Sequence, residues 1–332
     1  MRIVAGVIVA LLLLNGVAFM HAWRMTHYVA AGVTTRKPEE LNVLDKVLVL
    51  VTGVTIPRPA NRRTPADEGL PYATERFSAS DGVGLEAWRV PAAAPLTRVL
   101  MFHGYKGAKA GLLREARVLH DLNCEVVLVD QRGSGGSDGS VTSVGWFEAL
   151  DVAAAAAREK RDLPLYLLGN SMGAASVLRA ISRHDAKASG LILQAPFDRM
   201  LSTVRNRFNT FGLFSFPFAE MLVAYGGWQQ GFDAFQHNPV DYAAGVTVPT
   251  LMMGGQNDRR ATAAQMQGVF AALKGARHFV QFPSVGHDNL LKSDPHRWRA
   301  AVASFIGGTR KFSGNPPPEN APGDPAPAQY PR

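Results

Sequence analysis

The sequence contains very little cysteine, since Cys124 is the only one among 332 residues. A single cysteine excludes an intramolecular disulfide and any zinc site that is built from several cysteines. We interpret Cys124 as a small, half-buried residue beside a strand. The hydrophobic fraction of 47% is too high for a disordered chain, and the length fits one large α/β domain with additional segments.

The sequence also lacks a basic domain of the kind that binds nucleic acid. Residues 1–63 hold eight Lys or Arg and three Asp or Glu, whereas the remaining residues hold 27 and 24. The net charge is therefore +5 in the first segment and +3 in all the rest. Because the excess does not form a stripe on a domain, we expect no nucleic-acid partner.

An apolar run without any charge occupies residues 3–20, and Asn15 is its one strongly polar side chain. Extended to Trp23, it would form a helix of about 31 Å, which is enough to cross a bilayer core. We predict that residues 1–24 are a transmembrane anchor and that the protein is a membrane protein. A cleaved signal peptide, giving a secreted or periplasmic protein, and a buried helix of a soluble fold are the alternatives.

Basic residues around the apolar run indicate on which side of the membrane the catalytic domain lies. Arg24, Arg36 and Lys37 follow the run, against Arg2 and the amino terminus before it. The positive-inside rule then favours a cytoplasmic catalytic domain, whereas an export signal would place it on the other side.

Two further segments flank the expected domain. Residues 25–65 combine a short apolar stretch at 47–54, too short to span a membrane, with a Pro- and Arg-containing linker. We expect the short stretch to form a helix that rests on the domain or on the membrane surface. Residues 309–332 are rich in proline and predict a disordered tail, which leaves residues 66–308 as the folded domain.

Short β-branched runs alternate with helix-like stretches through this domain. Six apolar runs are separated mostly by stretches of helical length, a pattern that indicates a parallel sheet covered on both faces. Two earlier runs flank Asp81-Gly82 and predict an antiparallel hairpin. The eight expected strands are 72–78, 85–90, 98–102, 125–130, 165–169, 190–194, 247–253 and 277–282, and the expected helices are 112–122, 145–161, 172–183, 262–273 and 295–306.

One long stretch interrupts this alternation. Residues 199–246 are rich in phenylalanine and contain no convincing strand. We interpret them as a small helical lid over a site, and the alternative is additional core packing.

A strand, a tight turn and a helix meet at Ser171. Gly169 and Gly173 bracket this serine in the pattern G-x-S-x-G, after an apolar strand and before a run of small residues that opens a helix. That context is typical of a nucleophile elbow, in which only glycine leaves room on either side of a strained serine. The helix N-terminus also favours a developing negative charge.

An acid and a base follow Ser171 along the chain. Asp258 comes after one expected strand, and His287 lies in a loop after the next. The order Ser, Asp, His is the one expected for this type of elbow, with the carboxylate orienting the imidazole. Asp198 is the alternative acid, whereas Asp288 is a poor one because its side chain diverges from that of its neighbour.

Glycines elsewhere suggest an oxyanion hole and exclude a nucleotide loop. Gly104 follows a strand and lets the backbone turn, so that the N–H groups of Tyr105 and Met172 are the candidate oxyanion donors. His103 is better explained as a structural residue, since a triad needs one general base. The glycines at 133–139 do not fit G-x-G-x-x-G, and a tight loop held by Asp130 and Arg132 explains them better.

These motifs together resemble the α/β-hydrolase superfamily over about residues 60–307. Within it the chain is similar to serine aminopeptidase-like and monoacylglycerol-lipase-like hydrolases, including membrane-tethered ones. The resemblance implies an eight-stranded, mostly parallel sheet, with Ser171 as nucleophile, His287 as base and Asp258 as acid. It implies a serine hydrolase that cleaves a carboxylic ester, a lipid ester or a thioester through an acyl-enzyme, with no cofactor or metal. A peptidase or amidase, or an idle membrane-tethered scaffold, is the alternative.

Overall fold

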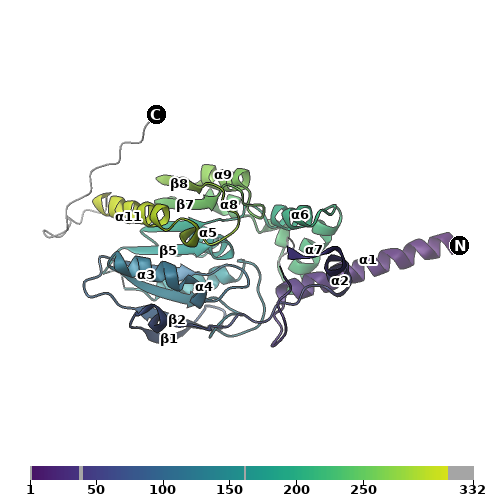
Figure 1. Ribbon diagram of the computed structural model, residues 1–332, viewed down its shortest axis with the longest axis horizontal. Helices are drawn as coiled ribbons and strands as arrows, with labels where there is room; N and C mark the ends of the chain where they lie inside the picture. Colours follow the sequence, from purple (N-terminus) through teal and green to yellow (C-terminus); the bar gives the residue numbers. More distant parts are fainter. Residues whose placement is uncertain (1, 37–39, 161, 313–332) are drawn as a thin grey trace.

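The computed structural model describes residues 2–36, 40–160 and 162–312, and an eight-stranded sheet forms its centre (Figure 1). Its strands are β1 (Ala73–Ser78), β2 (Gly84–Val90), β3 (Thr97–Phe102), β4 (Cys124–Asp130), β5 (Leu165–Asn170), β6 (Gly190–Gln194), β7 (Thr250–Gly255) and β8 (Arg277–Phe282). They lie in the order β1-β2-β4-β3-β5-β6-β7-β8. β2 pairs antiparallel with both β1 and β4, and the other neighbours pair in parallel. The predicted sheet, with its antiparallel hairpin, is confirmed.

Helices connect the strands and extend the fold at both ends. The α-helices are α1 (Arg2–Thr26), α2 (Val43–Thr52), α3 (Leu113–Asp121), α4 (Glu148–Ala157), α5 (Met172–Arg183), α6 (Met200–Phe211), α7 (Phe218–Gln230), α8 (Pro239–Ala243), α9 (Ala263–Ala272), α10 (Leu290–Ser293) and α11 (Pro295–Phe312). Short 3₁₀ helices occupy η2 (Pro65–Glu68), η3 (Lys109–Leu112) and η4 (Ala234–Gln236). Each helix expected between strands is present, with ends that shift by a few residues.

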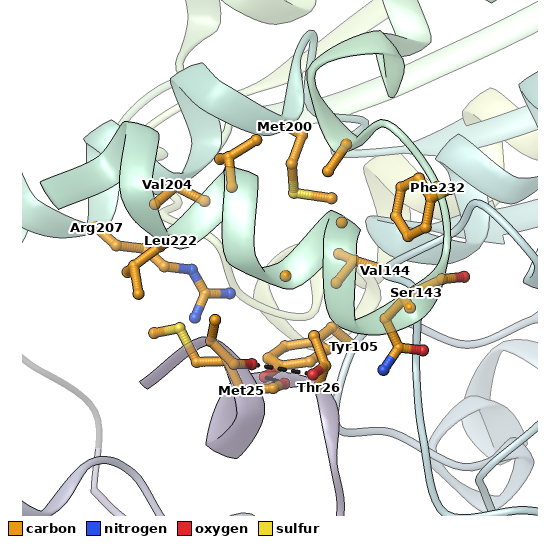
Figure 2. Close-up of a pocket in the computed structure, with 16 residues that line it drawn as sticks. Met25, Thr26, Tyr105, Ser143, Val144, Met200, Val204, Arg207, Leu222 and Phe232 are labelled. Carbon is orange, nitrogen blue, oxygen red and sulfur yellow. Dashed lines mark hydrogen bonds between the residues drawn. The ribbon is translucent and has the colours of Figure 1, made fainter. Parts of the chain in front are cut away.

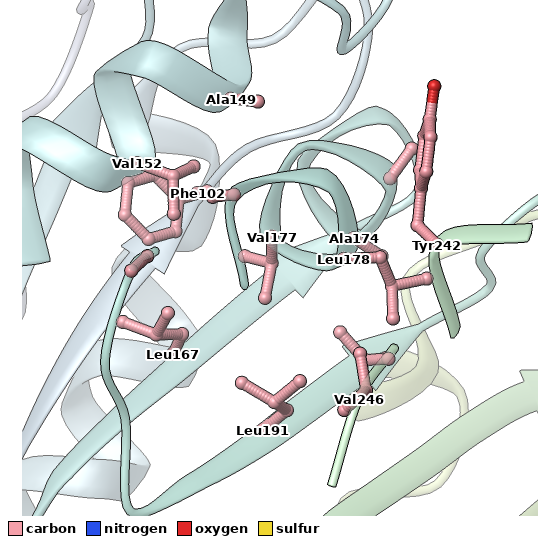
Figure 3. Close-up of a cluster of buried hydrophobic side chains, with 14 of the residues drawn as sticks. Phe102, Ala149, Val152, Leu167, Ala174, Val177, Leu178, Leu191, Tyr242 and Val246 are labelled. Atoms are coloured by element: carbon pink, nitrogen blue, oxygen red, sulfur yellow. The ribbon is translucent and has the colours of Figure 1, made fainter. Parts of the chain in front are cut away.

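The core consists of two layers, because successive side chains of a strand point to opposite faces of the sheet. Leu167 of β5 enters a layer with Val152 of α4 and Val177 of α5 (Figure 3). Its neighbour Leu168 enters the other layer, which contains Trp298 of α11. Burying a side chain of this size contributes about 1.5–3 kcal/mol. The predicted cover of helices on both faces is thereby confirmed.

Two local expectations need correction. Cys124, the first residue of β4, is fully buried in the layer beneath α3 rather than half-buried. The strand expected from residue 247 begins only at Thr250. Pro249 lies directly before it, and a proline has no N–H to donate to a strand ladder.

The chain before the sheet forms two helices with exposed apolar side chains. α1 projects away from the sheet, and α2 lies beside α1 (Figure 1). α1 is the one helix in the described ranges that is long and apolar enough to cross a membrane. α2 covers most of the short apolar stretch and ends at Thr52, with Gly53 as its C-cap. Its side chains Leu44 and Leu48 are 80% and 60% exposed.

The stretch interpreted as a lid consists of short helices joined by loops. α6, α7, η4 and α8 follow β6 in turn before the chain returns to β7, and no strand interrupts these residues. Phe214 and Phe216, between α6 and α7, are 92% and 74% exposed. At the other end, α11 continues to Phe312, past the expected start of the tail, and residues 313–332 lie outside the described part.

His237 lies fully buried at the base of this helical stretch and predicts an acid-sensitive fold. Its Nε2 donates to the Val144 carbonyl, 3.1 Å away, and burial lowers its pKa from 6.5 to about 4. At pH values between these two pKa values, His237 binds a proton in the unfolded chain but not in the folded chain. The free energy of unfolding should therefore fall by about 3 kcal/mol as the pH falls from about 6.5 to about 4.

We expect His237→Gln to remove most of this pH dependence, as measured by thermal unfolding at pH 7 and pH 4.5. The exposed His278, replaced in the same way, is the control. His103 is also buried with a lowered pKa, so an acid dependence of the same sign should remain in this variant. An unchanged pH slope in His237→Gln would contradict the assignment.

Candidate active site

Ser171 occupies a strained turn between β5 and α5. Its backbone dihedrals are φ 52° and ψ −108°, outside the regions that most residues adopt. A Cβ on Gly169 would lie 2.5 Å from the Gly173 backbone, and one on Gly173 would lie 2.3 Å from the Phe102 carbonyl oxygen. Glycine is therefore required at both positions, because any side chain there would clash and prevent β5 and α5 from packing this closely.

Ser171, His287 and Asp258 form one chain of hydrogen bonds. The His287 Nε2 lies 3.1 Å from the Ser171 Oγ, and its Nδ1 lies 2.6 Å from the Asp258 Oδ2. The other carboxylate oxygen of Asp258 accepts from the backbone N–H groups of Arg260 and Ala261, at 2.7 and 2.9 Å. The Asp258 side chain is fully buried, whereas the His287 side chain retains 20% exposure.

The alternative acid, Asp198, is engaged elsewhere. Its Oδ1 accepts from the Arg199 backbone N–H at 2.7 Å and from the Ser202 hydroxyl. No hydrogen bond joins Asp198 to His287 among the described residues, whereas Asp258 makes one directly. Of the two carboxylates considered, only Asp258 can therefore orient this imidazole in the observed conformation.

The two candidate oxyanion donors lie beside Ser171. Gly104, Tyr105, Ser171 and His287 line one cavity. Gly104 packs closely here, because a Cβ on it would lie 3.5 Å from the Ser171 Cβ. Met172 is the first residue of α5, and the first N–H groups of a helix have no acceptor within that helix. Both N–H groups thus belong to the segments around the serine.

The glycine-rich loop after β4 is held by charged groups, as predicted. Asp130 accepts from the backbone N–H groups of Lys109 and Gly136, at 2.7 and 2.8 Å. Arg132 binds the Asp151 and Asp81 carboxylates. A Cβ on Gly135 would lie 1.9 Å from Asp130, so the loop closes tightly over that carboxylate.

His103 is hydrogen-bonded to the start of this loop. Its Nε2 accepts from the Gln131 backbone N–H at 3.1 Å, and its Nδ1 lies 3.0 Å from the Gly104 carbonyl. The side chain is fully buried, and burial lowers its pKa. Its contacts are structural. In the part of the chain that is described, no cluster of three or more His, Cys, Asp or Glu side chains could hold a metal ion.

A group of cations near the serine was missed from the sequence. Arg207 of α6 and Arg260 line the cavity with Ser171. Burial, together with the charges of Arg207 and Arg260, lowers the pKa of the nearby Lys106 to about 8. The only hint in the sequence is that Arg260 follows Asp258 closely. α6 brings Arg207 from a distant segment that carries no motif.

Comparison with known proteins places this arrangement in context. Residues 93–224 match the family model described as serine aminopeptidase, S33, a span that includes Ser171 but ends before Asp258 and His287. The structure resembles an esterase of Pyrococcus furiosus with a TM-score of 0.64 and 21% identity, over 76% of this chain and 96% of that one. The structure therefore has the α/β-hydrolase fold.

Two sequence relatives extend the similarity beyond the matched span. The lysophosphatidylserine lipase ABHD12 of Danio rerio is 23% identical over 268 residues, which cover 71% of this chain and 67% of that protein. An uncharacterized protein of Escherichia coli, YfhR, is 24% identical over 252 residues, covering 71% and 81%. Both alignments are long enough to include most of the hydrolase fold.

Proposed function

We propose that this protein is a serine hydrolase that cleaves acyl esters through Ser171, His287 and Asp258. The observation that carries the proposal is the continuous hydrogen-bonded chain from the Ser171 hydroxyl through the imidazole to the buried carboxylate. Such a chain activates a hydroxyl that is otherwise a weak nucleophile. The esterase and lipase names among the relatives agree with this chemistry.

The reaction follows from the positions of these groups. His287 Nε2 takes the proton as the Ser171 Oγ attacks the acyl carbonyl carbon, and the backbone N–H groups of Tyr105 and Met172 hold the oxyanion. The tetrahedral intermediate expels the alcohol, which receives the proton from the imidazolium. Water, deprotonated by the same imidazole, then attacks the acyl carbon. The bond between that carbon and the Ser171 Oγ breaks, the imidazolium returns its proton to Oγ, and the acid is released. Asp258 keeps the ring oriented and stabilises its charged form throughout.

We propose a lipid ester as substrate and a membrane location, because the cavity of Ser171 shares Tyr105 and Arg207 with an apolar cavity beside α1. α1 would then be a single-pass anchor, as its length and composition allow. An amide substrate is the second candidate, because the matched family is described as serine aminopeptidase. A panel of esters, thioesters and aminoacyl amides over several acyl lengths separates these two candidates.

The test is labelling by a fluorophosphonate probe. We expect the wild-type protein to take the label on Ser171 and to hydrolyse a short p-nitrophenyl ester. In Ser171→Ala both should disappear, with activity falling by about 10⁶-fold. Ser182→Ala, on the same helix, is the matched control and should behave as the wild type. Labelling that survives Ser171→Ala would contradict the assigned nucleophile, and a wild type inert to every substrate would favour the scaffold alternative.

A further inference from the structure

The carboxyl-terminal half of α1 packs against the helical stretch interpreted as a lid. Ala18, Ala22 and Thr26 are buried at four-residue spacing along the side of α1 that faces α7. Asn15, the polar residue of the apolar run, accepts a hydrogen bond of 2.5 Å from the Tyr225 hydroxyl of α7. The Gln229 side chain donates to the Phe19 carbonyl at 2.9 Å. α1 is thus held by α7 over more than two turns.

This packing limits how far α1 can extend into a bilayer by itself. Only residues 2–14 precede the contact at Asn15, and they make a helix of about 20 Å. The hydrocarbon core is about 30 Å thick, so the side of α7 that bears this contact must enter it. Exposed apolar side chains on the neighbouring helices agree with the entry of α7 into the hydrocarbon core. Trp228 of α7 is 72% exposed, and α2 exposes Leu44 and Leu48.

An apolar cavity lies between α1 and this helical stretch. Figure 2 shows Met25 and Thr26 of α1 facing Met200 and Val204 of α6 across it. It shares Tyr105 and Arg207 with the cavity of Ser171. A further apolar cavity, between α1, α2 and α6, shares Met25 and Val204 with it. The three cavities therefore adjoin one another from the serine towards the exposed apolar helices.

Tyr105 links α1 to the reaction centre. Its hydroxyl donates to the Met25 carbonyl at 2.5 Å, across the floor of the cavity in Figure 2. Its backbone N–H is one of the two oxyanion donors assigned above. The Arg207 guanidinium lies 5.3 Å from the ring centroid on another side. The end of α1 consequently fixes the ring of a residue that lines the Ser171 cavity.

We propose that the last two turns of α1 form a wall of the acyl-chain site, which a lipid substrate enters from the bilayer between α1, α2 and α6. The inference rests on the proposed function and adds that the membrane helix is part of the site rather than a tether. It follows that the segment stays attached in the working enzyme. Each methylene group of the acyl chain that contacts this wall buries more apolar surface, so blocking the wall should penalise long chains selectively.

The test compares Met25→Trp with Met20→Trp. Both place the same larger side chain on α1, but Met25 lines two of the cavities and Met20 lines none of those described. We expect Met25→Trp to lower kcat/KM for dodecanoyl to hexadecanoyl p-nitrophenyl esters at least tenfold more than it lowers kcat/KM for the acetyl ester. Met20→Trp should change neither. Equal behaviour of the two variants towards long chains would overturn the proposal.

A second measurement does not depend on any variant folding. A fluorophosphonate with a dodecyl chain and a terminal diazirine should label Ser171 and, after irradiation, cross-link to a peptide that contains residues 18–26. Cross-links confined to other segments, or an intact mass showing that the active protein has lost residues 2–26, would overturn the role of α1. A wild type that takes no label at all would instead overturn the proposed function.

Discussion

Asp258→Asn is expected to lower kcat for a short p-nitrophenyl ester by about 10⁴-fold, with KM changed only a few-fold. The carboxylate now accepts from His287 Nδ1 at 2.6 Å and from two backbone N–H groups on its other oxygen. An amide in the same place turns an NH₂ group towards Nδ1 and favours the wrong tautomer, in which Nε2 carries the proton. The Ser171 hydroxyl then has no general base.

The matched control is Asp198→Asn, because Asp198 is the other carboxylate that the sequence offers as the acid. Its hydrogen bonds go to Arg199 and Ser202 and not to the imidazole, so we expect kcat to stay within about threefold of the wild type. Steady-state rates of both variants, with folding checked by circular dichroism, decide between the two acids. The assignment fails if Asp198→Asn abolishes turnover and Asp258→Asn does not.

Lys109→Met is expected to lower the free energy of unfolding by about 3–5 kcal/mol. The Lys109 side chain is completely buried, with its Nζ on Asp130 and 2.8 Å from Glu86, and it lies 4.3 Å from the centroid of the Trp88 ring. Methionine fills a similar volume but leaves Asp130 without its cation, whereas Glu86 keeps an ion pair with Arg76 at 3.5 Å. Asp130 is itself buried, so its charge cannot be solvated by water instead.

Thermal and urea unfolding of the detergent-solubilised protein measure this effect, with Lys187→Met as the control. Lys187 pairs with Asp185 on the surface, where both side chains are more than 60% exposed, and its loss should change stability by less than about 1 kcal/mol. The double variant Lys109→Met with Asp130→Asn should recover part of the loss. If Lys109→Met is as stable as the wild type, the buried ion pair between Lys109 and Asp130 does not stabilise the glycine-rich loop after β4.

Local pattern was enough to predict most of the sheet. The strands are continuous apolar runs because both faces of a parallel sheet are covered, and the helices between them have ordinary lengths. The elbow was predictable because the steric demand at Gly169 and Gly173 is local to one turn. Strand ends were less predictable, as at Thr250, because they depend on where neighbouring strands stop pairing.

The sequence pointed to three residues that the structure joins by hydrogen bonds, but not to the groups around them. Ser171, Asp258 and His287 each follow a strand, and the carboxyl ends of parallel strands meet at one edge of a sheet. Choosing Asp258 over Asp198 as the hydrogen-bond partner required the fold, since both aspartates follow strands. Arg207 carries no motif, and only the packing of α6 brings it beside the serine.

By itself the sequence determined the fold class, the strained serine and the apolar character of the first helix, because each depends on residues that are close together in the chain. Only the tertiary structure decided what the apolar helix packs against. Its hydrogen bonds to Tyr105, Tyr225 and Gln229 join residues that lie far apart in sequence. Such contacts arise from the packing of whole elements, which no local pattern of side chains encodes.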